Sequence, residues 1–194
     1  MERSRVTELH YMTPFENLPS IAQYGILSNL RAAAFSHRSV ALADVQARRD
    51  ARVVPQGRPL HEYVNLYFDA RNAMMYSRRS DDLAVVRVSA RVLDVPGAVV
   101  TDGNAANNVT AFYSSPGGLS SLEEDRVFAE WWDHEDPWEK QERKRQRQAE
   151  VLVPDVVPPA LILGCYTWKT GGVVACQRLV GHWSVEVNTH VFFG

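Results

Sequence analysis

Short segments rich in β-branched and aromatic residues recur along this chain, and their irregular order restricts the fold more than any other feature. Strand-like segments lie at 7–12, 63–68, 84–88, 92–100, 149–153, 160–166, 172–180 and 183–193. Apolar residues at helical spacing predict helices that begin near Phe15, cover about 40–51 and 122–132, and run from Pro137 to about residue 146. Because strand and helix do not alternate regularly, we expect an α+β fold whose sheet is mainly antiparallel.

The length and the longest apolar run limit the class of protein. With 194 residues the chain has the size of one domain, and we expect residues 1–194 to form a single domain. A content of 45% hydrophobic and 23% charged residues excludes a fibrous or disordered chain. The longest near-apolar run, 151–165, is interrupted by three prolines and Asp155, and it is too short to cross a membrane. Residues 1–8 are polar and charged, unlike a secretory signal, so we expect a cytoplasmic protein without membrane contact.

The formal charge of −2 conceals an uneven distribution along the chain. Residues 1–91 carry 13 Arg and no Lys against nine acidic residues, a net charge of +4. Residues 92–194 carry eight basic and 14 acidic residues, a net charge of −6. A basic excess in one half is compatible with a polyanionic partner on one face or with an ordinary solvated surface, and composition leaves both interpretations open.

Several common catalytic motifs are missing from the sequence. Neither Gly117-Gly118 nor Gly171-Gly172 has the neighbours of a phosphate-binding glycine loop, and no Gly-x-Ser-x-Gly motif occurs. Cys165 and Cys176 lack zinc spacing, and Cys165 lies in an apolar run typical of a buried thiol. His134 lies among acidic residues without the regular spacing of a metal site, which favours a solvated acidic turn. We expect no bound metal.

Three groups of residues remain as candidates for chemistry. His10 lies between a predicted strand and a predicted helix, where it could donate to a ribose hydroxyl or be a structural histidine. Arg48, Arg49 and Arg52 form a basic cluster on a predicted helix, suited either to phosphate contact or to solvent. Glu150 opens an apolar strand, where a carboxylate either forms a salt bridge or polarises a reacting group.

Several short segments are more informative as an ordered set than one by one. They are Leu9-His10-Tyr11-Met12-Thr13, Glu16 to Ile21, Gly25-Ile26-Leu27, Val45 to Arg49, Val54-Pro55, His61 to Val64, Leu66 to Tyr76, Thr101 to Ala105, and Gln148 to Val153. Together they resemble the DarT-type toxins, which are bacterial DNA ADP-ribosyltransferases. The resemblance covers most of residues 8–166, whereas 80–98 and 123–142 match poorly.

The resemblance implies a fold and a set of site residues. The fold is that of ADP-ribosyltransferases, in which two packed, mainly antiparallel sheets with helices around them form a cleft for NAD⁺. Glu150 and Arg49 correspond to catalytic residues, and a carboxylate suits the task of stabilising the ribose cation that develops as nicotinamide leaves. The cofactor-binding residues implied are His10, Tyr11, Met12, Thr13, Asn17, Tyr67, Arg71 and Met74. The DNA-binding residues implied are Arg48, Arg52 and Met75.

The same resemblance implies an activity and partners. The activity is transfer of ADP-ribose from NAD⁺ to a base of single-stranded DNA, thymine in the best-known case, with release of nicotinamide. The partner is a macrodomain antitoxin that removes ADP-ribose, and we expect the toxin to be a monomer. Two alternatives stay open: the same chemistry on guanine in DNA or on RNA, and a catalytically silent module that binds NAD⁺ or nucleic acid.

Overall fold

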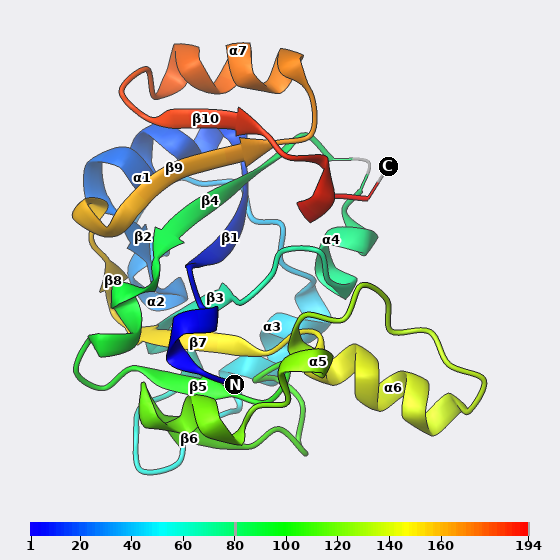
Figure 1. Ribbon diagram of the computed structural model, residues 1–194. Coiled ribbons are helices and arrows are strands. Elements are labelled where there is room, and N and C mark those ends of the chain that lie inside the picture. The colour runs from blue at the N-terminus through cyan, green and yellow to red at the C-terminus, as the bar shows by residue number, and fades with distance from the viewer. Residues whose placement is uncertain (80, 194) are drawn as a thin grey trace.

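The computed structural model describes residues 1–79 and 81–193, and a large sheet runs through it (Figure 1). The strands are β1 (Glu8–Pro14), β2 (Ile26–Leu27), β3 (Tyr63–Tyr67), β4 (Leu83–Ser89), β5 (Val99–Thr101), β6 (Phe112–Ser114), β7 (Glu150–Pro154), β8 (Val156–Val157), β9 (Ile162–Thr167) and β10 (Ser184–Val187). Eight of them form one sheet in the order β10-β9-β4-β1-β3-β7-β5-β6, while β2 and β8 form a two-stranded sheet. All pairs are antiparallel except β9 with β10. The α+β class and the mainly antiparallel pairing are confirmed.

The large sheet is nearly divided in its middle. β1 pairs with β4 along its whole length, whereas β1 and β3 share only the pair His10 and Tyr67. The two sheets expected from the resemblance are therefore two four-stranded halves of one hydrogen-bonded sheet, and the halves meet at a single residue pair.

Seven α-helices surround this sheet in the described part of the chain. They are α1 (Leu18–Tyr24), α2 (Asn29–Ala32), α3 (Ala43–Asp50), α4 (Ala73–Ser77), α5 (Glu124–Val127), α6 (Pro137–Gln146) and α7 (Thr170–Leu179). Three of them begin at side chains that accept from free backbone N–H groups, and Ser28 does so for Arg31 at the start of α2. Asn72 accepts from the N–H groups of Met74 and Met75 at the start of α4, and Asp136 accepts from Trp138 at the start of α6. None of the described helices is both long and apolar enough to span a membrane.

Residues 172–180 were expected to form a strand, and this prediction is wrong, because they lie in α7. The Gly-Gly-Val-Val segment has low intrinsic helix propensity, but tertiary structure outweighs propensity here. β9 and β10 are parallel neighbours, so the chain must cross back from the end of one to the start of the other. Figure 1 shows α7 making this crossing above the two strands.

Three other predicted elements are shorter than expected. The helix expected at 122–132 is reduced to α5, because the guanidinium of Arg147 takes the carbonyl oxygens of Val127 and Ala129. The strand expected at 92–100 is a 3₁₀ turn, Ala90–Asp94, followed by β5. The strand expected at 183–193 is β10 followed by a 3₁₀ turn, Thr189–Val191.

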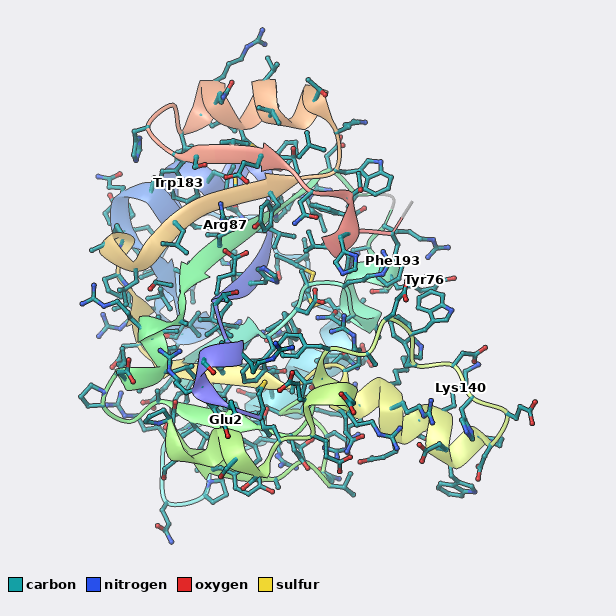
Figure 2. The ribbon with its side chains drawn as sticks, in the orientation of Figure 1. Glu2, Tyr76, Arg87, Lys140, Trp183 and Phe193 are labelled. Carbon is teal, nitrogen blue, oxygen red and sulfur yellow. The ribbon has the colours of Figure 1, made fainter. Side chains whose placement is uncertain are left out.

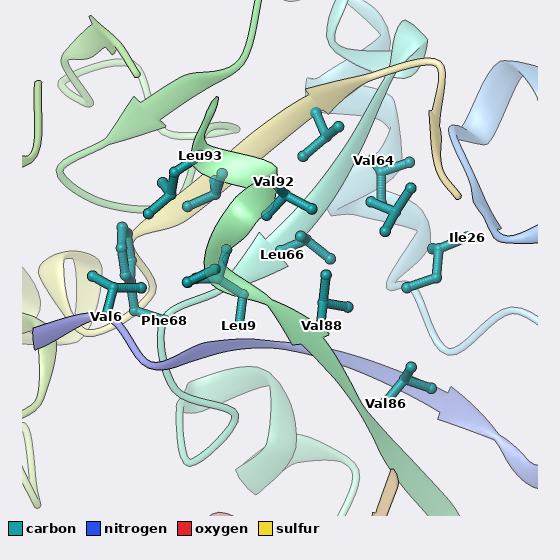
Figure 3. Packing of buried hydrophobic residues seen from close by; sticks show 14 of the residues in the cluster. Val6, Leu9, Ile26, Val64, Leu66, Phe68, Val86, Val88, Val92 and Leu93 are labelled. Carbon is teal, nitrogen blue, oxygen red and sulfur yellow. The ribbon is translucent and has the colours of Figure 1, made fainter. Parts of the chain in front are cut away.

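The main hydrophobic core lies on one face of the sheet, and Figure 3 shows part of it. In β3, Val64 and Leu66 point into this core, while Tyr67 belongs to a second cluster. In β7, Val151 and Val153 also point into the main core. Because side chains alternate along a strand, Tyr67 and Glu150 are directed to the opposite face. The alternation thus leaves that face available for the site.

Candidate active site

The candidate site lies where the two halves of the sheet meet. His10 of β1 is paired with Tyr67 of β3, and Tyr67 is paired with Glu150 of β7. These three residues stand in one row across three neighbouring strands. The register of the sheet therefore brings together residues that are far apart in the sequence.

Glu150 is completely buried and is held from several sides. Its two carboxylate oxygens accept from Nη1 of Arg49 at 3.2 and 3.1 Å, and Oε1 also accepts from the N–H of Ala105 at 3.4 Å. Its own N–H donates to Oγ1 of Thr101 at 3.0 Å. Burial raises the pKa of Glu150, and the Arg49 guanidinium partly offsets this effect. The carboxyl is thus a stronger proton acceptor than an exposed glutamate.

Arg49 connects Glu150 to a cavity. It lies in the last turn of α3, and its side chain is 6% exposed. Its Nη2 atom has no hydrogen-bond partner among the described residues, although it is buried. A buried donor without an acceptor costs free energy, so this atom is suited to a ligand group.

The cavity has a volume of about 330 Å³. Arg49 lines it, as do six of the predicted cofactor-binding residues: Tyr11, Met12, Thr13, Asn17, Tyr67 and Met74. The amide of Asn17 donates to Thr13 Oγ1 at 3.0 Å and to the carbonyl of Arg38 at 2.8 Å, which fixes the 36–42 loop against β1. Burial raises the pKa of Tyr67, and the charge of Glu150 adds to this effect, so the phenol stays protonated.

Two predicted cofactor-binding residues do not line this cavity. His10 Nε2 lies 3.1 Å from Glu8 Oε1, and its Nδ1 accepts from the N–H of Ala70 at 3.0 Å. Burial alone would raise the pKa of Glu8, but hydrogen bonds from His10 and Arg87 outweigh it and lower that pKa to about 2. Arg71 donates to the carbonyl oxygens of His190 and Phe192 and stacks on Phe193. In this structure both residues act as structural contacts at the edge of the site.

The predicted DNA-binding residues have different positions. Arg48 is exposed and pairs with Asp44 at 3.3 Å. Arg52 donates to Asn108 at 3.0 Å on the surface. Met75 is 1% exposed and packs in the second hydrophobic cluster, so it offers no surface to a DNA strand in this structure, and its role as a DNA contact stays a prediction. The neighbouring Met74 lines the cavity, and Met75 does not.

A second buried ion pair supports the strand that carries Glu150. Arg147 Nη2 lies 2.9 Å from Asp69 Oδ2, and the Arg147 side chain is 1% exposed. Burial would raise the pKa of Asp69, but Arg147 outweighs it and lowers the pKa. This pair joins the end of β3 to the start of β7.

Several residues of the site carried no signal in the sequence strong enough to single them out. Asn104, Lys144 and Gln148 line the cavity and also line an open groove of about 430 Å³. The other groove residues are Asn107, Pro137, Lys140, Gln141 and Arg145. Asn104 and Gln148 lie inside two of the segments that resemble the family, 101–105 and 148–153, whereas Lys144 and the other groove residues lie outside the matching segments. Within the described ranges, no group of three or more His, Cys, Asp or Glu residues is placed to hold a metal ion.

Comparison with known proteins gives the same class from sequence and from structure. The chain is 33% identical over 171 residues to a DNA ADP-ribosyl transferase–DNA ADP-ribosyl glycohydrolase fusion protein of Thermosipho africanus. The matched region covers 84% of this chain and 42% of that protein. It is also 31% identical over 180 residues to a DNA ADP-ribosyl transferase of Thermus sp., and this match covers 85% of this chain and 84% of that enzyme. The chain thus spans less than half the length of the fusion protein.

Solved structures show the same relationship. Thermosipho africanus DarTG in complex with ADP-ribose has a TM-score of 0.83 and 28% identity, covering 96% of this chain and 51% of that one. Thermus sp. 2.9 DarT in complex with NAD⁺ has a TM-score of 0.79 and 22% identity, covering 97% and 98%. The fold is therefore that of an ADP-ribosyltransferase. Residues 10–193 match the family model described as ssDNA thymidine ADP-ribosyltransferase, DarT, and the chain belongs to the DarT family.

Proposed function

We propose that this chain transfers ADP-ribose from NAD⁺ to a thymine base of single-stranded DNA, with Glu150 and Arg49 as its catalytic residues. One observation carries the proposal: a fully buried carboxylate is held by a guanidinium that borders a cavity and has one nitrogen without a hydrogen-bond partner among the residues that the structure describes. Membership of the DarT family supplies the reaction class.

The residues around the cavity suit NAD⁺ as the co-substrate. NAD⁺ supplies the ADP-ribosyl group, and its nicotinamide is the leaving group. The free Nη2 of Arg49 would donate to an oxygen of the dinucleotide, and Thr13 and Asn17 offer hydroxyl and amide groups in the same wall. Tyr67 and Met74 supply an apolar surface for a flat ring.

Glu150 would act in two ways. Its negative charge would stabilise the positive charge that develops at the anomeric carbon as the bond to nicotinamide breaks. It would also accept a proton from the attacking base, for which a carboxyl with a raised pKa is well suited. N3 is the only ring nitrogen of thymine in DNA that bears a hydrogen. As N3 bonds to the anomeric carbon, its proton passes to Glu150 and nicotinamide leaves with the electron pair of the broken bond.

Arg49 would control access to this carboxylate. Its Nη1 donates to both carboxylate oxygens of Glu150. Arg49 lines the cavity, whereas Glu150 is not among the lining residues. Glu150 can accept a proton from the base only after the guanidinium turns towards the cavity. A bound anionic group that attracts Nη2 would favour this movement, so substrate binding would uncover the base that the reaction needs.

The groove beside α6 is the proposed path of the DNA strand. It continues into the cavity through Asn104, Lys144 and Gln148, and Lys140 offers a further cation for phosphates. Arg52 is fixed to Asn108 in the loop that forms one wall of this groove, and Arg48 lies on the same helix as Arg49. An unpaired strand suits this site because its bases need no unstacking from a duplex.

The experiment that tests the proposal is nucleoside mass spectrometry. The protein is incubated with NAD⁺ and with DNA or RNA single strands that contain one kind of base each, and the strands are then digested. ADP-ribosyl thymidine is expected from the DNA strand with thymine alone. Glu150→Gln should lower the yield by about 10²- to 10⁴-fold, as loss of a general base does. Modification of guanine or RNA instead, or full activity of Glu150→Gln, would contradict the proposal.

We also propose that a separate enzyme reverses the modification. A DNA ADP-ribosyl glycohydrolase is fused to the related transferase in Thermosipho africanus, and a macrodomain antitoxin of that activity would relieve toxicity here. The chain would act as a toxin in the cytoplasm, as a monomer and a single domain. Growth arrest on expression, relieved by Glu150→Gln and by co-expression of such a glycohydrolase, is the corresponding test.

A further inference from the structure

Four aromatic side chains from three distant segments form a cluster beside α4. The cluster consists of Tyr76 on α4, Trp131 and Trp132 between α5 and α6, and Phe193 near the end of the chain. The rings of Trp131 and Phe193 are stacked at 5.5 Å, and Tyr76 meets Phe193 edge to face at 5.2 Å. Figure 2 shows Tyr76 and Phe193 together at one edge of the molecule.

The outer rings of this aromatic cluster are open to solvent. Trp131 is 50% exposed and Tyr76 is 42% exposed, whereas Phe193 beneath them is buried. Large aromatic rings that serve packing alone are usually covered, because their stabilising effect comes from burial. Two neighbouring rings left half-open therefore indicate a contact surface.

Two guanidinium groups flank the exposed rings. Arg79 lies 4.4 Å from the centre of the Tyr76 ring, and Arg71 lies 4.3 Å from Phe193 and 5.9 Å from Trp131. The Nε atom of Arg71 has no hydrogen-bond partner among the described residues. Stacking surfaces with adjacent cations match the two components of a nucleotide, a flat base and an anionic phosphate. Asp133, which follows Trp132, is paired with Lys140 at 2.5 Å, so its charge is partly neutralised.

The cluster is within reach of a strand bound in the active site. Ala73, Met74 and Ser77 of α4 line the cavity, while Tyr76 of the same helix belongs to the cluster. A helix with its side chains is about 10–12 Å across, and a stacked strand advances about 3.4 Å per nucleotide. The distance across α4 thus corresponds to about three nucleotides.

We propose that the aromatic cluster is an accessory binding site for single-stranded nucleic acid, in which a base about three nucleotides from the reacting one stacks on Trp131 and Tyr76. The site rests on the proposed function, because it needs a strand in the cavity. Stacking accepts any base, so the cluster adds affinity for strands that are long enough and does not select the modified base.

The test measures the binding of a fluorescently labelled single strand by fluorescence anisotropy in the absence of NAD⁺. For a strand of about twelve nucleotides with one central thymine, Trp131→Ala should weaken binding about five- to 150-fold, the usual effect of losing one stacked base. Trp131→Phe keeps a ring and should bind within about threefold of the wild type. Leu179→Ala is the control, because Leu179 is 42% exposed on α7 and lies outside both the cluster and the groove beside α6. A trinucleotide is too short to reach the cluster and should bind all four proteins equally.

Unchanged affinity of Trp131→Ala for the long strand would overturn the proposal and leave the cluster as a surface for another class of molecule. If Trp131→Ala does not fold, Tyr76→Ala serves for the same comparison. Because NAD⁺ is omitted, the result does not depend on transfer. Trp131-dependent binding without any ADP-ribosylation by the wild type would refute the proposed activity alone. Transfer by the wild type together with binding of the long strand that is independent of Trp131 would refute the accessory site alone.

Discussion

Replacement of Arg49 by glutamine should destabilise the protein strongly at neutral pH and much less at acid pH. Arg49 Nη1 lies 3.1 Å from Oε2 of Glu150, which is fully buried. At an effective dielectric constant of about 20, two unit charges about 4 Å apart attract by about 4 kcal/mol. Removal of one partner of a buried ion pair typically costs about 3–5 kcal/mol, because a charge is left without compensation. A loss of this size is a large part of the 5–15 kcal/mol that stabilises an ordinary domain.

The pH dependence follows from the direction of the Glu150 pKa. Burial already raises this pKa above its unfolded value, and loss of the Arg49 charge removes the effect that opposes the rise. The folded Arg49→Gln variant therefore binds a proton that the unfolded chain releases. Its deficit in free energy of unfolding is greatest at high pH and shrinks as the pH falls and Glu150 becomes neutral.

Urea denaturation at about pH 8 and about pH 5 measures this effect directly. Glu150→Gln should cost less at about pH 8, about 1–3 kcal/mol, because the stranded Arg49 cation borders the cavity and can reach water. The double variant Arg49→Gln/Glu150→Gln should lose less than the sum of the single variants, since no charge is left unpaired. Arg48→Gln removes the adjacent exposed pair with Asp44 and should change stability by no more than about 1 kcal/mol. A deficit of Arg49→Gln that is equal at both pH values would refute the reasoning.

Two further predictions follow from other contacts of the site. The free energy of unfolding should fall as the pH drops from about 4.5 towards 2, because the lowered pKa of Glu8 stabilises the folded state only while the carboxylate is ionised. Glu8→Gln should flatten acid denaturation in that interval. An unchanged denaturation curve would contradict the assignment. Met75→Ala should lower the free energy of unfolding by about 2–5 kcal/mol, since Met75 is buried. Met74→Ala should mainly raise the KM for NAD⁺, because Met74 lines the cavity. Equal losses of stability in urea for the two variants would show that the two sides of α4 are not distinct.

The sequence was a good guide to elements whose local signals agree with one another. Pro137 predicted the start of α6, and the β-branched residues around Val151 predicted β7. It failed at 172–180, because β-branched residues beside two glycines favour a strand locally, while the parallel pairing of β9 and β10 requires a crossing helix. Nothing local encodes that pairing.

The same contrast holds for the site. The ordered motifs pointed to Glu150 and Arg49, and the alternation along β3 and β7 is enough to direct Tyr67 and Glu150 away from the main core. The alternation cannot say which of two neighbours on a helix is buried. Met74 lines the cavity and Met75 does not, because the packing of α4 against the second cluster sets its rotation.

By itself the sequence determined the class of fold and the family and predicted Glu150 and Arg49 as catalytic residues, because these inferences depend on residue type and order. The tertiary structure alone decided that Arg49 pairs with a fully buried Glu150 and that four aromatic rings meet beside α4. It also decided that His10 forms hydrogen bonds with Glu8 and with the N–H of Ala70 and does not line the cavity. These features depend on contacts between residues that are far apart in the sequence; Arg49 and Glu150, for example, are 101 positions apart. Such distances are set by strand register and helix packing, which minimise the free energy of the whole chain and leave no trace in any one segment.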